Sequence, residues 1–333
     1  MTGQHVGVRP GLEHDLTRWL VALHAVEEQA LVHLSAARHL VGEPALAAEV
    51  ARHREETREH RETLRALLAE RGGRPSRLRD AAATVNRMGF LLYTALAPDA
   101  PGKLLVDSFT YEYFEIAAYR MLAQLAAHAG DAAVVRAAQG ILAEEQRMAA
   151  QLADRFDWAV QASARRRGGP RAAHLVTHLQ EARAIEAQAG ALLALGTLVA
   201  RPPALVAHLR AERRRTAAQR ARLAARLRAL GASPRGAGPL ALRSAAMRVT
   251  GAAWAGAWAL QRDTPARLAC FLYAERALQI AAYELLGREA AFLEDVETAE
   301  LATQLLGEER AATGRLAELL EAAAEASLRR TGV

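Results

Sequence analysis

Apolar residues recur every three or four positions through eight long segments of this chain. In the first segment the pattern is carried by Leu16, Leu20, Leu23, Leu31 and Leu34. Because this spacing places the apolar side chains on one helical face, each segment predicts an amphipathic helix. The predicted helices span residues 12–41, 44–71, 101–129, 131–161, 172–200, 203–230, 265–292 and 295–328. Runs of β-branched residues are scarce, so the predicted fold class is all-α, without a sheet.

Four glutamates occupy or border the apolar stripes of the first four predicted helices. They are Glu27, Glu56, Glu112 and Glu145. An ionised carboxylate that is buried without a partner is strongly destabilising, and the usual remedy is a cationic side chain or a metal ion. Metal binding is therefore the first hypothesis.

The second half of the chain repeats the first. An offset of 159 residues places Glu27 on Glu186, and further along an offset of 164 places Tyr119 on Tyr283. Two homologous halves are the simplest explanation of this self-similarity.

We therefore predict two domains, residues 1–164 and 171–333, joined by a linker at residues 165–170. Four amphipathic helices of similar length pack most simply as a four-helix bundle, which is the architecture expected for each domain. A shorter helical insert is expected between the second and third helices of each bundle, at residues 76–96 and 239–260. We expect the two halves to pair within the molecule.

A centre with two metal ions needs carboxylates that converge from all four helices of a bundle, because hard oxygen ligands suit iron and manganese. The first half offers such a set in Glu27, Glu56, Glu112 and Glu145, with Glu115 one turn beyond Glu112 and His53 one turn before Glu56. The alternative is that neighbouring arginines neutralise these acids and that the protein is a helical scaffold or interaction protein with salt-bridged cores.

The second half has lost much of this set. Glu56, Glu112 and Glu115 are replaced there by Arg215, Arg276 and Gln279. We expect a salt-bridged core in which Arg215 and Arg276 neutralise the remaining acids, Glu186, Glu212 and Glu309. The sequence thus predicts metal ions in the first half and none in the second.

The single cysteine, Cys270, excludes an internal disulfide. The first residues show no signal-peptide pattern, so a cytoplasmic location is expected. The longest nearly apolar stretch, residues 189–200, is too short for a transmembrane helix, and no membrane partner is predicted.

The net charge of +6 is unevenly divided. Residues 1–164 contain 18 basic and 21 acidic residues, whereas the remainder contains 25 basic and 16 acidic ones. Seven arginines lie between positions 213 and 228, which raises the question of nucleic-acid binding. Arginines around a helix more often form a solvated surface, so nucleic acid is not an expected partner.

Three motifs carry a resemblance to a known family. They are His53-Arg-Glu-Glu56-Thr, Glu112-Tyr-Phe-Glu115-Ile-Ala-Ala-Tyr119 and Leu142-Ala-Glu-Glu145. With them the first half resembles the ferritin-like family of bacterial stress proteins typified by YciE and YciF, and the second half resembles a degenerate copy. The resemblance implies a dimetal carboxylate centre at Glu27, Glu56, Glu112, Glu115 and Glu145.

The chain departs from the Glu-x-x-His pairs of related centres, because Glu59 follows Glu56 by three positions and Met148 follows Glu145 by three. The nitrogen ligand is therefore open, with His53 preferred over His60. The resemblance implies two iron ions, with manganese as the alternative, and oxidation of Fe(II) by dioxygen or peroxide in a stress response. If the protein is an enzyme, it would be an oxidoreductase of the diiron oxidase or peroxidase type, with catalytic residues that the sequence does not identify.

Overall fold

The computed structural model describes residues 10–81, 84, 99–166, 171–200, 203–234 and 264–330. These residues form long helices joined by short turns, and no strand occurs among them. The all-α prediction is therefore confirmed for this part of the chain. None of the described helices is long and apolar enough to cross a membrane.

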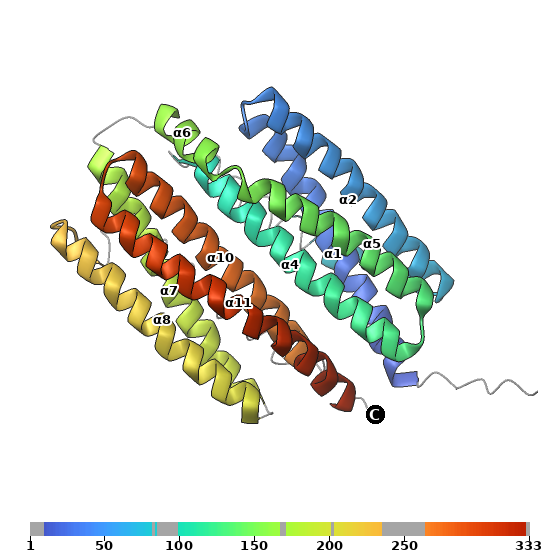
Figure 1. Cartoon of the computed structure of the whole chain (residues 1–333). Coiled ribbons are helices and arrows are strands. Elements are labelled where there is room, and N and C mark those ends of the chain that lie inside the picture. The colour runs from blue at the N-terminus through green and yellow to red at the C-terminus, as the bar shows by residue number, and fades with distance from the viewer. Residues whose placement is uncertain are drawn as a thin grey trace, which may run out of the picture.

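Within the described residues of the first half, five helices can be followed along their whole length (Figure 1). They are α1 (Pro10–Leu40), α2 (Pro44–Glu70), α4 (Ala100–Ala129), α5 (Ala132–Ala153) and α6 (Phe156–Arg166). The predicted inserts fall largely outside the described residues. Residues 77–81, at the beginning of the first insert, are helical.

One predicted helix is divided in two. We expected a single helix over residues 131–161, but α5 ends at Ala153 and α6 begins at Phe156. At the junction the amide of Asp154 bonds to the carbonyl of Gln151, and the amide of Arg155 bonds to that of Leu152. These bonds of i→i+3 type tighten the turn and end the α-helix. The prediction was wrong because no glycine or proline marks this break.

The described part of the second half contains four long helices in the same order. They are α7 (Arg171–Val199), α8 (Pro203–Ala229), α10 (Thr264–Phe292) and α11 (Val296–Arg330). The ends of α2 and α8 show the repeat in detail, because Gly72 and Gly231 have φ angles of +65° and +69°. A left-handed glycine at this position allows the following amide to bond back to the last helical turn, as Gly73 and Ala232 both do.

The two halves pack against each other along α4 and α10, the third long helix of each repeat (Figure 1). Tyr113 of α4 stacks on Tyr273 of α10 with ring centroids 5.8 Å apart, and Phe114 lies 5.2 Å from Phe271. One large apolar cluster includes residues from both halves. The expected pairing of the halves within one chain is thus present.

The backbone itself approaches closely at the end of this seam. A Cβ atom added to Gly102 of α4 would lie 3.2 Å from Leu285 of α10. The amide of Gly102 also donates to the hydroxyl of Ser163 at 3.1 Å. A Cβ atom at position 102 would therefore require the side chain of Leu285 to shift by a few tenths of an ångström.

Candidate metal centre

The acids singled out by the sequence lie inside the first half, on all four of its long helices. Glu27 comes from α1, Glu56 from α2, Glu112 and Glu115 from α4, and Glu145 from α5. The side chains of Glu27, Glu112, Glu115 and Glu145 are almost completely buried. Burial of Glu27, Glu112 and Glu145 agrees with their predicted positions on the apolar stripes, whereas Glu56 is only partly buried.

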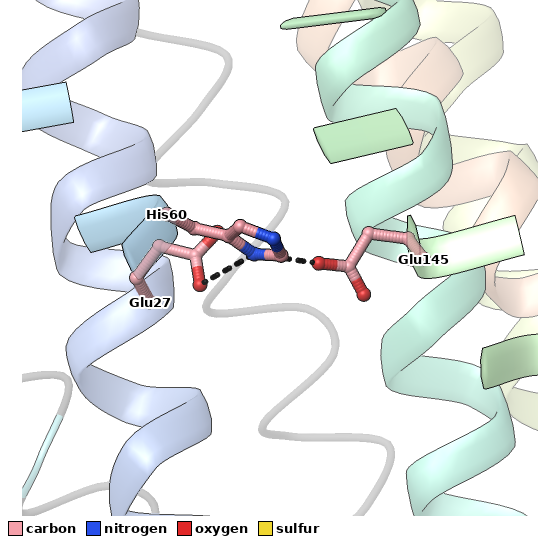
Figure 2. Close-up of side chains that lie close together, drawn as sticks. All are labelled: Glu27, His60 and Glu145. Atoms are coloured by element: carbon pink, nitrogen blue, oxygen red, sulfur yellow. Dashed lines mark ion pairs between the residues drawn. The ribbon is translucent and has the colours of Figure 1, made fainter. Parts of the chain in front are cut away.

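Glu27 and Glu145 meet on either side of a histidine (Figure 2). The Nδ1 atom of His60 lies 3.1 Å from Oε1 of Glu145 and 3.7 Å from Oε2 of Glu27. The other ring nitrogen of His60 lies 2.7 Å from a carboxylate oxygen of Glu144. Glu27, His60 and Glu145 form one group of ligand-type atoms within 4.8 Å of one another.

A second group shares Glu145. The Nε2 atom of His53 lies 3.4 Å from Oε2 of Glu112 and 3.7 Å from Oε2 of Glu145. These three residues also place ligand-type atoms within 4.8 Å of one another. Because Glu145 belongs to both groups, it connects two potential cation positions through a single carboxylate.

Two of the predicted site residues lie outside these groups. Glu56 lies at the edge of the site, where it contacts His53 at 3.2 Å and Arg147 at 2.9 Å. Its side chain is 22% exposed. Glu115 is buried one helical turn after Glu112, but neither group includes it.

His60 was omitted from the predicted set, where His53 was preferred as the nitrogen ligand. The structure brings both histidines among the acids. The signal was present in the sequence, because His60 follows His53 by seven residues and therefore lies two turns along the same face of α2. Burial of both rings shows that this face points inward.

Burial and charge compete at this site. Burial raises the pKa of Glu145 to about 7, although the contact with His60 opposes the shift. Burial also raises the pKa of Glu27. It disfavours the charged form of His60, but the carboxylates of Glu145 and Glu27 outweigh that effect and raise its pKa to about 11. The imidazolium groups therefore supply positive charge to the acids when no metal is bound.

Three carboxylates at the site keep unused acceptor atoms. Oε2 of Glu27, Glu112 and Glu145 is buried and accepts no hydrogen bond. None of these three glutamates forms an ion pair with an arginine of the described chain. Buried acceptors without donors are destabilising, so these oxygen atoms are suited to a cation.

The other carboxylate oxygen of Glu27, Oε1, accepts a hydrogen bond. The hydroxyl of Tyr119 donates to Oε1 of Glu27, and the hydroxyl of Tyr283 donates to Glu186 at the equivalent place in the second half. The pair persists in the repeat that has lost the counterparts of Glu56, Glu112 and Glu115. Tyr119 is therefore best understood as a residue that positions Glu27.

The equivalent core of the second half is neutralised by arginine. Arg276 pairs with both Glu212 and Glu309, and Arg215 contacts the same two acids. These pairs agree with the prediction from the sequence. Glu186 differs, because it accepts hydrogen bonds from the neutral side chains of Gln279 and Tyr283. At the offset of 159, His53 and His60 correspond to Glu212 and Gln219, so both ring nitrogens are also lost.

A third group of ligand-type atoms lies where the two halves meet. It consists of Asp99 from the first half and His178 and Glu181 from the second. The expectation that the second half has no such group was therefore wrong. Searching within one repeat missed it, because Asp99 comes from the other. The ammonium group of Lys103 contacts both Asp99 and Glu181, so a cationic side chain already occupies the position between these acids.

A buried carboxyl group in the second half, that of Glu275, allows the effect of burial on a pKa to be tested. Burial raises the pKa of Glu275 from its ordinary value of 4.5 to about 8, with Gln188 as its hydrogen-bond donor at 3.1 Å. The folded carboxyl stays neutral over a range in which the unfolded one ionises. The contribution of Glu275 to the free energy of unfolding is therefore fully present below pH 4.5 and is lost as the pH rises toward 8.

We expect Glu275→Gln to stabilise the protein at pH 8 by several kcal/mol at most and to have little effect near pH 4.5. Urea unfolding of both proteins across this pH range measures the difference. A constant difference at all pH values would contradict the assignment of a neutral buried carboxyl.

Comparison with known families gives one match that covers both halves. The family model described as "Domain of unknown function (DUF892)" matches residues 12–165 and again residues 171–329. The two matched segments agree with the tandem repeat in the sequence and in the helices. Buried carboxylate and histidine groups that could bind metal thus occur on a two-repeat helical framework. With both halves matched, the chain belongs to the DUF892 family.

Proposed function

We propose that the first half is a ferritin-like domain that binds two iron ions, with manganese as the alternative metal. The observation that carries this proposal is the position of Glu145 between two histidine-containing groups. We also propose domain boundaries at residues 1–164 and 171–333, with the second domain as a degenerate copy. A reducing cytoplasm and a role in stress follow from the sequence and the family resemblance, and they belong to the same proposal.

The proposed ligand roles follow from the two groups. Glu27 and His60 would hold one ion, His53 and Glu112 would hold the other, and Glu145 would be shared. Glu56 and Glu115 are close enough in sequence to His53 and Glu112 to complete the two coordination shells. Tyr119 keeps one oxygen of Glu27 engaged, so that the other oxygen faces the site.

The chemistry of the donor set favours iron or manganese. Carboxylate oxygens with a few imidazole nitrogens suit these ions, whereas structural zinc sites prefer thiolates and a closed tetrahedron. Two ferrous ions bound here would supply two electrons, enough to reduce one peroxide to two waters with two protons. The histidines must be neutral to act as ligands, so metal binding would displace their protons.

Anaerobic titration of the full chain with Fe(II) tests the proposal. We expect two ions per chain, measured by elemental analysis after removal of unbound metal. Addition of dioxygen or peroxide should then convert bound Fe(II) to Fe(III), as followed by Mössbauer spectroscopy. Bound iron that does not oxidise would leave a metal-binding protein without the proposed redox function.

A non-enzymatic scaffold is the rival function, and one observation favours it. His53 and His60 both have pKa values raised by the surrounding acids, so the core already contains compensating positive charge without metal. A titration in which Fe(II) and Mn(II) both fail to bind would establish the scaffold and overturn the dimetal centre.

A further inference from the structure

The outer face of α8 carries five arginines without acidic partners. They are Arg210, Arg213, Arg214, Arg220 and Arg228, and all five are exposed. None of them forms an ion pair or side-chain hydrogen bond with another described residue. We propose that this face, called here the α8 arginine face, binds the phosphate backbone of double-stranded nucleic acid without sequence preference.

The five guanidinium groups share one side of the helix. At about 100° per residue they fall within an arc of about 120°. From Arg210 to Arg228 the face extends for about 27 Å, which matches about eight base pairs of duplex. Figure 1 shows α8 at the outer edge of the second half, so a long rigid partner can approach it.

Other arginines of α8 have a different task. Arg215 contacts acids in the core, and Arg222 and Arg226 pair with Glu308 and Asp295 of the α11 region. These three face the protein. The acids available to the helix are thus used on its inner side, which leaves the outer side with uncompensated charge.

The equivalent helix of the first half has a balanced surface. On α2, Arg54 and Arg58 both contact Glu55, and Arg61 and Arg65 both contact Glu62. Helix α8 contains only one acid, Glu212, which is buried in the core. The fold therefore accommodates acids beside the arginines of this helix, as α2 shows. The absence of acids from the outer face of α8 is a feature of the second repeat and is not imposed by the fold.

Charge and shape favour duplex phosphates over other anionic partners. Arginine binds phosphate oxygens through its planar fork of donors. Single-stranded nucleic acid is usually held by stacking on aromatic rings, and α8 has no phenylalanine, tyrosine or tryptophan. Alanines such as Ala217, Ala218 and Ala221 lie between the arginines, so this face lacks the bulky apolar side chains that insert into a lipid surface. The proposal thus departs from the expectation in the sequence analysis that nucleic acid is not a partner.

Fluorescence anisotropy with labelled DNA duplexes of about 20 base pairs tests the proposal on the full chain. Two duplexes of unrelated sequence should bind with similar affinity. Binding should weaken steeply between about 50 and 200 mM salt, because each phosphate contact releases counterions. Changing all five arginines of the face to glutamine should reduce the affinity at least about tenfold and flatten the salt dependence.

A matched control changes the five arginines of α2, Arg52, Arg54, Arg58, Arg61 and Arg65, to glutamine. This variant loses the same net charge but should keep its affinity for the duplex. An equal loss in both variants would show a general charge effect and overturn the α8 site. If the α8 variant bound the duplex with the affinity of the wild type, the proposed α8 site would also be overturned.

Two further measurements complete the test. The double variant Arg213→Glu, Arg220→Glu should also lose binding, and it provides the answer if the fivefold variant does not fold. Vesicles of anionic lipid are the competing probe. If they bind through the α8 arginine face while the duplexes do not, the nucleic-acid assignment is wrong.

Discussion

Glu145→Gln is expected to prevent binding of the two proposed metal ions, because its carboxylate belongs to both ligand groups. The amide oxygen of glutamine is a poorer ligand than a carboxylate, and one amide cannot serve two cations equally well. Elemental analysis after anaerobic loading with Fe(II) should find fewer than one ion per chain. Retention of two ions would contradict the shared role of Glu145.

The loss should not be a consequence of unfolding. Burial raises the pKa of Glu145 to about 7, so its carboxyl is already partly neutral near physiological pH. A neutral amide of the same shape therefore fits the apo protein. The circular dichroism spectrum of the variant should match that of the wild type.

Two other substitutions sharpen the result. Glu27→Gln and Glu112→Gln each alter a single group, so each variant should keep an ion in the other group. Glu275→Gln makes the same chemical change in the buried core of the second half, where no loss of iron is expected. Loss of iron from Glu275→Gln would place a binding site in the second half.

Much of this site could be predicted because a buried acid interrupts a helical stripe. Glu27, Glu112 and Glu145 each stand where an apolar residue is expected, and all three point inward. Glu56 stands on the edge of its stripe, and the structure leaves it partly exposed beside Arg147. The period of the pattern thus predicts the direction of a side chain better in the middle of a stripe than at its margin.

Other features depend on partners that are distant in sequence. His178 of α7 meets Asp99, at the start of α4, only because these helices belong to halves that pack together. The break between α5 and α6 has no glycine or proline to indicate it. Periodicity describes one helix at a time, so contacts between repeats and breaks of this kind lie beyond it.

The repeat itself supplied information that a single domain would lack. Tyr119 and Tyr283 keep the same contact with a core glutamate, whereas Glu112 and Arg276 occupy equivalent positions with opposite charge. Equivalent positions that keep the same residue in both halves maintain the shared fold. Equivalent positions with different residues give the two cores different chemistry. In the second core Glu212 and Glu309 pair with guanidinium groups, whereas Glu112 and Glu145 of the first core contact histidines.

Glu309→Gln is expected to destabilise the second half by about 3–5 kcal/mol, because it removes one partner from a buried ionic cluster. Glu309 is fully buried and contacts Arg276, Arg215 and Gln219. Its loss leaves two guanidinium groups to share Glu212, and the desolvation of the second charge is no longer compensated.

Urea unfolding followed by circular dichroism measures the effect, with Glu297→Gln as the matched control. Glu297 pairs with Arg226 but has a side chain that is 77% exposed, so its loss should change stability by about 0–1 kcal/mol. Iron binding by the first half should be unchanged in both variants. If Glu309→Gln were no more destabilising than Glu297→Gln, the arginines of the second core would not depend on their acids. The description of the second core as a salt-bridged one would then lose its energetic basis.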